Sequence, residues 1–215
     1  MSGVKICKTI EGLNSINRTE MELVIWRRTI STSIKDWINC MDSKNLPNFR
    51  ILVNLSDLTH ALESKLKKFD LKVEKMRGQL IDDIYNLASK FADINQCEDV
   101  DVRLQRISND ACWKFHRDVV KTRLLTTYCG PSTEWVKNKY SEKALLEQRE
   151  YNGPLEQLRK FDVAVFKGNY AQPDKGIVHR SPSIVNTGIT RLMLCINQRT
   201  DTSPAPLDRG KDDLI

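Results

Sequence analysis

The chain has 215 residues, of which 40% are hydrophobic and 29% are charged, values typical of one globular domain rather than of a disordered chain. Lys and Arg number 34 against 28 Asp and Glu, a formal net charge of +6, which favours a solvated basic surface over a dedicated nucleic-acid interface. The apolar runs are only a few residues long. A membrane span needs about 20 apolar residues, and the opening residues lack a signal-peptide core, so we expect a cytoplasmic protein.

The first third of the sequence has the apolar period of α-helices. The segment 31–41 begins with hydroxyl residues suited to a helix N-cap and then repeats apolar side chains every three or four positions. The same spacing recurs over 56–69 and over 76–91. This pattern predicts helices within about 30–95, with their apolar stripes in the core.

The period then changes to that of strands. Val100, Val102 and Leu104 alternate with polar residues, which indicates a half-buried strand. Further segments rich in β-branched and aromatic residues are separated by Gly, Pro and Asn. We expect strands in the segments 112–120, 121–128, 162–168, 176–181 and 190–197.

Helices followed by strands predict a single α+β domain over 1–198. In this domain the N-terminal helices would pack on a β-sandwich or jelly-roll core at about 98–198. The charged segment 137–160 is interpreted as a partly helical insertion, either a lid over a pocket or a solvated surface excursion. The segment 199–215 has few apolar residues, so we expect a flexible tail.

Two of the three histidines lie in the strand-rich half. His116 and Asp118 stand two positions apart, so on a strand both side chains point to one face and can hold the same ion. His179 follows Gly176 near the start of a later strand. Two histidines and one carboxylate on one side of a metal form the facial triad of non-haem Fe(II) oxygenases. Arg191, at the start of the last strand, can pair with a carboxylate through two parallel hydrogen bonds.

The order His116-x-Asp118, then His179, then Arg191 resembles that of the Fe(II)/2-oxoglutarate dioxygenases, whose fold is a double-stranded β-helix, a form of jelly roll. This resemblance implies that the triad binds Fe(II), that Arg191 anchors the distal carboxylate of 2-oxoglutarate, and that oxygen takes the remaining open position to oxidise a C–H bond. Other candidates for contact with that carboxylate are Tyr128, Arg123 and Arg180.

A second resemblance is narrower and covers most of the chain. The segments 112–135, 176–182 and 190–196, together with 23–27, are similar to the bacterial family called domain of unknown function 1826. This family implies no particular reaction.

The chain departs from the dioxygenase pattern at one position that concerns the co-substrate. Fe(II)/2-oxoglutarate dioxygenases often carry a hydroxyl residue two positions after the anchoring arginine, where this chain has Met193.

Two other functions stay open. A non-catalytic zinc protein of bacterial metal homeostasis would complete a site at His116 and His179 with Cys112 or Cys129, since zinc accepts Cys and His and prefers four ligands. On a strand, however, Cys112 would lie about 13 Å from His116, too far for one ion without a bend. A ligand-binding β-barrel without metal would leave the triad uncoupled.

The remaining residue patterns are less specific. The six cysteines form no CxxC pair and are expected to be reduced, mostly buried thiols rather than a disulfide framework. His60, on an expected helix, is interpreted as a structural residue. Basic residues near the expected pocket permit an anionic small-molecule substrate, and the sequence leaves its identity and the oligomeric state open.

Overall fold

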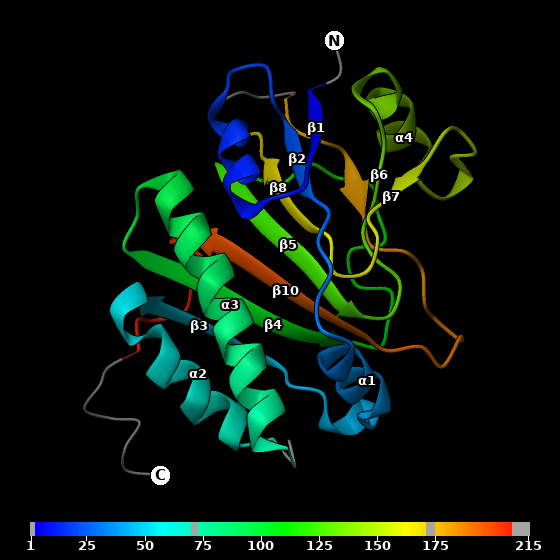
Figure 1. Ribbon diagram of the computed structural model, residues 1–215. Coiled ribbons are helices and arrows are strands. Elements are labelled where there is room, and N and C mark those ends of the chain that lie inside the picture. Colours follow the sequence, from blue (N-terminus) through cyan, green and yellow to red (C-terminus); the bar gives the residue numbers. More distant parts are fainter. Residues whose placement is uncertain (1–2, 70–72, 171–174, 208–215) are drawn as a thin grey trace.

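The computed structural model describes residues 3–69, 73–170 and 175–207, which form helices and two β-sheets (Figure 1). The strands of the larger sheet are β1 (Val4–Cys7), β2 (Leu23–Trp26), β3 (Phe49–Asn54), β4 (Asp99–Ile107), β5 (Thr122–Cys129), β8 (Val163–Lys167) and β10 (Arg191–Gln198). Within the described residues this sheet has seven strands in the order β1-β2-β8-β5-β10-β4-β3. Neighbouring strands run antiparallel, except that β1 and β2 pair in parallel.

Helices cover one face of the large sheet (Figure 1). These are α1 (Thr32–Cys40), α2 (Leu58–Lys67) and α3 (Glu74–Asn95). The N-cap of α1 is Ser31, whose Oγ accepts a hydrogen bond from the backbone N–H of Ile34 at 3.4 Å. On α3, the periodic side chains Leu80, Ile84 and Phe91 are fully buried. Burial of each such side chain is worth about 1.5–3 kcal/mol. The three helices predicted from the apolar period are therefore present.

One segment of the predicted helical region is a strand. β3 lies between α1 and α2 in the chain and pairs antiparallel with β4, with Ile51 opposite Val102. Ile51, Leu52 and Val53 are all buried. A short, continuous apolar run fits a buried strand or a buried helix equally well by period, and pairing with β4 decides between them. β1 and β2, which precede the helices, are further strands that the sequence pattern did not predict.

The central strands β5 and β10 divide the interior into two apolar clusters. On one face, Leu124, Leu192 and Leu194 pack beneath the helices in the main core. On the other face, Leu125 and Cys195 belong to a second cluster, which includes side chains of the smaller sheet. Because side chains alternate along a strand, each strand contributes to both clusters. The candidate site lies on the second face.

The smaller sheet closes over this second face. Its strands are β6 (Glu134–Trp135), β7 (Glu156–Gln157) and β9 (His179–Arg180), in the order β7-β6-β9. An isolated antiparallel bridge joins His116 to His179 at the edge of β9. Apart from this bridge, the prediction of a strand over 112–120 is wrong. Cys112 has a left-handed φ of 57°. The backbone N–H and carbonyl of Phe115 bond to the side chain of Gln148 rather than to a neighbouring strand.

The charged segment 137–160 is partly helical and packs beside both histidine-bearing segments. It contains α4 (Ser141–Glu147) and β7. The ring of Tyr151 packs edge-on against that of Phe115, with centroids 5.4 Å apart, and both belong to an apolar cluster with Val178. The segment is therefore anchored to the body of the protein rather than being a fully solvated excursion.

The segment 199–207 lies against the large sheet. The hydroxyl of Ser203 donates to Asp101 Oδ2 at 2.6 Å, and the N–H of Leu207 donates to a carbonyl of β3 at 2.9 Å. The expectation of a flexible tail is therefore wrong for these residues. Polar contacts attach them to the sheet, and such contacts leave no apolar pattern in the sequence. The rest of the expected tail, 208–215, lies outside the described residues.

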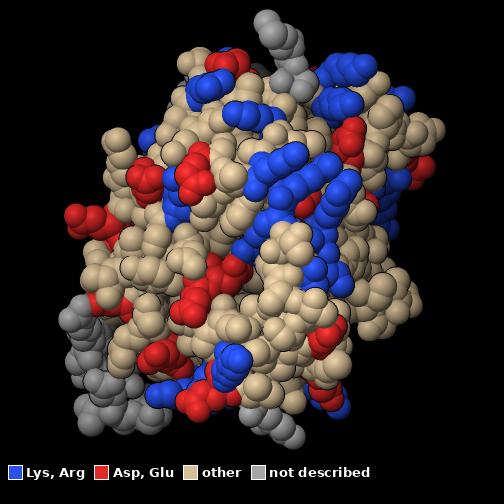
Figure 2. All heavy atoms as spheres, in the orientation of Figure 1, with Lys and Arg blue, Asp and Glu red and all other residues tan. Residues whose placement is uncertain are grey.

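Charges are mixed on the face that carries the helices. Figure 2 shows Lys and Arg side chains gathered near the middle of this face, directly beside a group of Asp and Glu. Arg28 forms a close ion pair with Asp83, a residue of α3. No helix in the described part of the chain is long and apolar enough to cross a membrane.

Candidate metal centre

His116 and His179 come together on one rung of antiparallel pairing. The backbone N–H of each residue donates to the carbonyl of the other, both at 3.0 Å. Residues directly opposite each other in such a pair send their side chains to the same face, and the two ring centroids lie 4.5 Å apart. Asp118 follows two positions after His116, in the loop that leads to β5. The structure thus brings the three predicted ligands together from the two-residue strand β9, from an isolated bridge and from a loop.

The three side chains present ligand atoms close enough for one metal ion. Oδ1 of Asp118 lies 3.6 Å from Nε2 of His116, and Oδ2 lies 3.4 Å from Nε2 of His179. One ligand atom from each residue lies within 4.8 Å of the others, and the described residues contain no second group of this kind. Metal bonds to nitrogen and oxygen of about 2.0–2.2 Å can span these separations.

Backbone carbonyls orient both rings with Nε2 toward the site. Nδ1 of His116 lies 2.8 Å from the carbonyl oxygen of Lys114, and Nδ1 of His179 lies 3.0 Å from that of Ile177. Because a carbonyl oxygen only accepts, Nδ1 carries the hydrogen and the lone pair of Nε2 stays free in the neutral ring. Metal-bound histidines are typically oriented by this contact. Burial lowers the pKa of His179, which favours the neutral form that binds metal.

Asp118 supplies the negative charge of the site. Burial opposes its ionisation, but the neighbouring His179, His116 and Arg123 together lower the pKa of Asp118 to about 2. Arg123 donates to Oδ1, whereas Oδ2 is buried and accepts no hydrogen bond from the described part of the chain. A buried acceptor without a donor costs about 1–3 kcal/mol, and more when it is charged. A cation at Oδ2 would remove this cost, so the triad fits a divalent metal.

The surroundings of the triad are apolar on one side and open on the other. The ring of Phe166 lies 4.9 Å from that of His179, centroid to centroid, and Trp135 belongs to the same buried cluster as Phe166. The side chain of His116 is 35% exposed, whereas that of His179 is 4% exposed. A small molecule can therefore approach the triad from the side of His116, while the far side excludes water.

Arg191 is a buried cation without a carboxylate partner. Its Nε donates to the carbonyl of Pro131 and its Nη1 donates to Oγ of Ser181, both at 2.7 Å. Nη2 faces the sulfur of Met193 at 3.7 Å. No described carboxylate lies within ion-pair distance, and burial lowers the pKa of Arg191 to about 10. A buried guanidinium without a counter-charge favours an anionic ligand.

Ser181 is a site residue that the sequence reasoning missed. The hydroxyl expected two positions after Arg191 is absent there, yet the hydroxyl of Ser181, which directly follows β9, contacts the guanidinium. Ser181 stands two positions after His179, so alternation sends both side chains to one face. That spacing is the signal that could have identified it.

Tyr128 faces the opposite side of the sheet, so the prediction that it contacts the carboxylate held by Arg191 is wrong. Its hydroxyl donates to Oδ2 of Asp83 on α3 at 2.6 Å, and its ring lies in the core beneath the helices. The reason is register. Tyr128 stands five positions after Arg123 on β5, an odd number, so the two side chains point to opposite faces.

The two other candidate arginines are both engaged. Arg180 turns to Glu134, with Nε donating to Oε2 at 2.7 Å. Arg123 lies within the site, where it donates to Asp118 and, through Nε, to Oδ1 of Asn197 at 2.8 Å. Arg123 therefore orients the carboxylate of the triad. Both arginines have a carboxylate partner, whereas Arg191 has none among the described residues.

The cysteines lie outside the ligand group. Cys112 is exposed, and the sulfur of Cys129 donates to the carbonyl of Thr190 at 3.7 Å. The group of ligand atoms found among the described residues contains neither thiol. A zinc site completed by cysteine therefore has no support in this part of the chain. His60 lies on α2 and is also outside the group.

Fold and site together define an α+β protein with a His–Asp–His triad suited to a metal ion and a buried arginine that bonds to Ser181, two positions after His179. The chain belongs to the family described as Protein of unknown function (DUF1826), whose sequence model matches residues 7–197. The family predicted from the sequence is thereby confirmed. No curated protein matches the chain.

Several solved structures are similar to this chain. AviO1 from Streptomyces viridochromogenes Tue57 is 13% identical, with 94% of this chain and 100% of that chain covered and a TM-score of 0.41. A prolyl-4-hydroxylase from Pseudomonas putida is 8% identical over 89% and 99%, with a TM-score of 0.44. The non-heme alpha ketoglutarate dependent carbocyclase SnoK from nogalamycin biosynthesis is 6% identical over 87% and 82%, with a TM-score of 0.38. At this level of similarity, function has to be argued from the residues of the site.

Proposed function

We propose that the protein is a non-haem oxygenase that binds Fe(II) and uses 2-oxoglutarate as co-substrate. One observation carries this proposal: beside a two-histidine, one-carboxylate triad, the buried guanidinium of Arg191 lacks a carboxylate partner and bonds to Ser181, two positions after the ligand His179. The triad is the donor set of non-haem Fe(II) oxygenases, and the guanidinium suits a carboxylate. All six cysteines are free, which supports a reducing, cytoplasmic setting.

The strand order supports a double-stranded β-helix core. Four antiparallel neighbours of the large sheet, β8-β5-β10-β4, lie opposite β7-β6-β9 and the bridge at His116. These make two layers of four, the arrangement of a jelly roll. In this interpretation both histidines belong to the smaller layer, and Arg191 begins a strand of the larger one.

Each side chain of the site has a role in this proposal. The triad would hold the iron, which, when bound, supplies the oxidation of a C–H bond together with dioxygen and the co-substrate. Arg191 and Ser181 would hold the distal carboxylate of 2-oxoglutarate through charge-assisted and neutral hydrogen bonds. Arg123 keeps the carboxylate of Asp118 in place, as partners of metal ligands commonly do.

The test uses protein purified without oxygen. Addition of Fe(II) and 2-oxoglutarate should give a weak visible charge-transfer band, and later exposure to oxygen should give succinate even without substrate. His116→Ala or His179→Ala should abolish metal uptake. Arg191→Met should keep the metal and weaken the binding of 2-oxoglutarate by about tenfold or more, because a charge-assisted pair is lost.

Arg180→Met is the matched control, because this arginine is already paired with Glu134. It should bind 2-oxoglutarate like the wild-type protein. Metal retained in both histidine variants would refute the ligand assignment. Tight stoichiometric zinc, with neither the absorption band nor succinate, would favour a non-catalytic zinc protein instead.

A further inference from the structure

A pocket of about 620 Å³ opens at the end of the large sheet where β5 begins and β10 ends. Its walls come from the loop after Asp118, from Tyr170 and from the turn that follows β10. Arg123 lines this pocket and also donates to Asp118. The side chain of Arg123 therefore contacts both the pocket and one of the proposed iron ligands. Its volume is that of a site for a small molecule rather than for a macromolecule.

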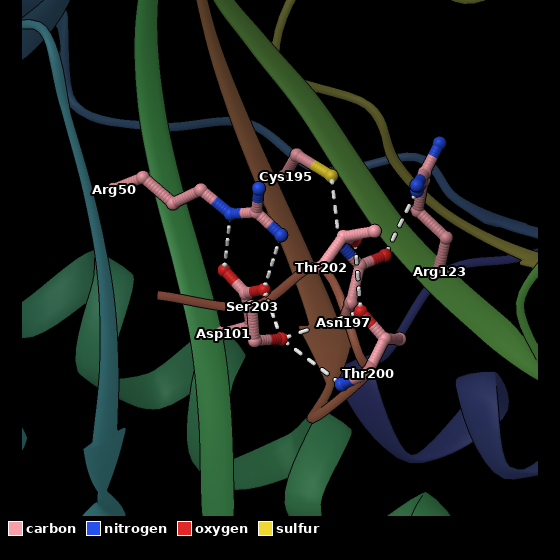
Figure 3. A network of polar contacts seen from close by, with 8 residues as sticks. All are labelled: Arg50, Asp101, Arg123, Cys195, Asn197, Thr200, Thr202 and Ser203. Carbon is pink, nitrogen blue, oxygen red and sulfur yellow. Dashed lines mark hydrogen bonds and ion pairs between the residues drawn. The ribbon is translucent and has the colours of Figure 1, made fainter. Parts of the chain in front are cut away.

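One wall of the pocket is held by a buried polar network (Figure 3). Arg50 donates to both oxygens of Asp101, at 2.9 and 2.6 Å, and Asp101 is fully buried. The hydroxyl of Ser203 donates to Asp101, and the N–H of Thr200 donates to Oγ of Ser203 at 2.9 Å. These contacts fix the turn after β10 against the sheet, so the wall is part of the folded protein.

The side chains that line the pocket carry more positive than negative charge. Its cations are Arg50, Lys121, Arg123 and Arg199, and its carboxylate is Asp201. Arg50 and Arg123 are already paired with Asp101 and Asp118. In the described part of the chain, no carboxylate lies within ion-pair distance of Lys121 or Arg199. Two positive charges are therefore free to bind a ligand.

The rim of the pocket adds apolar surface. Val119 is 72% exposed and Tyr170 is 75% exposed, although both are large hydrophobic side chains. Exposed apolar side chains beside unpaired cations suit a molecule with a carbon skeleton and an anionic group.

We infer that this pocket binds the substrate and that the substrate is a small organic anion, with a carboxylate or phosphate held by Lys121 and Arg199. The assignment of the ligand as substrate rests on the proposed oxygenase function, whereas the binding of an anion can be tested without iron. Lys121 and Arg199 fix the anionic end, and the skeleton extends past Arg123 toward the triad.

The test is calorimetric titration of the metal-free, full-length protein with phenyl phosphate, with benzoate and with neutral benzyl alcohol. At least one of the two anions should bind and benzyl alcohol should not, and the anion that binds distinguishes phosphate from carboxylate. The double variant Lys121→Gln/Arg199→Gln should weaken anion binding by about tenfold or more, since two charge-assisted contacts are lost. Lys67→Gln/Lys75→Gln, on the helices, removes the same charge far from the pocket and should bind like the wild-type protein.

Three results would overturn the inference: binding of neither anion, equal binding of benzyl alcohol, or unchanged binding in the Lys121/Arg199 variant. A separate measurement tests the proposed oxygenase function. Arg191→Met should lose 2-oxoglutarate in zinc-loaded protein while it retains the anion probe. If the wild-type protein binds the probe but not iron or 2-oxoglutarate, the anion pocket stands and the oxygenase proposal falls.

Discussion

Gly168 leaves room for the loop that carries Asp118. Its N–H donates to the carbonyl of Lys121 at 3.1 Å, and a Cβ at this position would meet the carbonyl oxygen of Asp118 at 2.5 Å and that of Val120. We expect Gly168→Ala to displace this loop from the histidine rings and to weaken zinc binding by about 10- to 100-fold, measured by competition with a chelator. Gly78→Ala on α3, where a Cβ meets nothing within 4 Å, should bind zinc normally. Equal affinities in all three proteins would contradict this role.

At the scale of single residues, the sequence identified the candidate metal ligands but not the contacts that surround them. A His-x-Asp pair and a later histidine can be recognised because residue type and spacing carry the chemistry. The partner of Tyr128 could not be found in this way, because Asp83 lies far away in the chain on a helix whose docking no local pattern specifies. The contact of Ser181 with Arg191 likewise depends on how two layers meet.

At the scale of elements, the turn after α4 supports the His116 segment through one side chain. Oε1 of Gln148 accepts the N–H of Phe115 at 2.8 Å, and Nε2 donates to the carbonyl of Phe115 at 3.1 Å. Gln148→Ala removes both bonds and a third, from Nε2 to the carbonyl of Leu145 at 2.8 Å. Each is worth about 1 kcal/mol, so the free energy of unfolding in urea should fall by about 2–3 kcal/mol. Zinc affinity should fall as well, because the next residue is His116.

The control for this change lies on α4, just before that turn. Leu146 is 86% exposed, so Leu146→Ala should alter neither stability in urea nor zinc affinity. If Gln148→Ala binds zinc as tightly as Leu146→Ala does, the insertion does not support the metal site.

The same glutamine explains where the prediction of elements failed. Long periodic segments such as α3 were predicted, because a stripe repeated over many residues has one interpretation. The segment 112–120 has the composition of a strand, but the side chain of Gln148 takes the backbone groups of Phe115 that a strand would use. Composition does not reveal which partner a backbone N–H will find.

At the scale of the whole molecule, a bound metal would join segments that lie far apart in the chain, since the ligands come from 116–118 and from His179. Zinc at about 100 times its dissociation constant should add about 2.7 kcal/mol to stability. For a chain of this size, that raises the melting temperature by about 5–10 °C in a thermal shift assay. His179→Ala should show no such rise. An equal rise in this variant would mean that zinc binds elsewhere, for example at the free thiols.

The overall architecture could be predicted only in outline. The order of helices and strands indicated an α+β domain, because a change of apolar period is a local signal. The attachment of 199–207 to the sheet was not predictable, because it depends on the buried carboxylate of Asp101, about a hundred positions earlier in the chain. Contacts of that separation leave no trace in a periodic pattern.

The reciprocal pairing of His116 with His179 limits how this chain can change in length. The two imidazoles share a face only because their residues are directly opposite each other. Insertion or deletion of one residue beside either histidine would shift the pairing by one and turn one ring outward. Length can therefore vary in connections away from this pair, such as the stretch between α1 and β3, whereas the immediate neighbours of both histidines must keep their count.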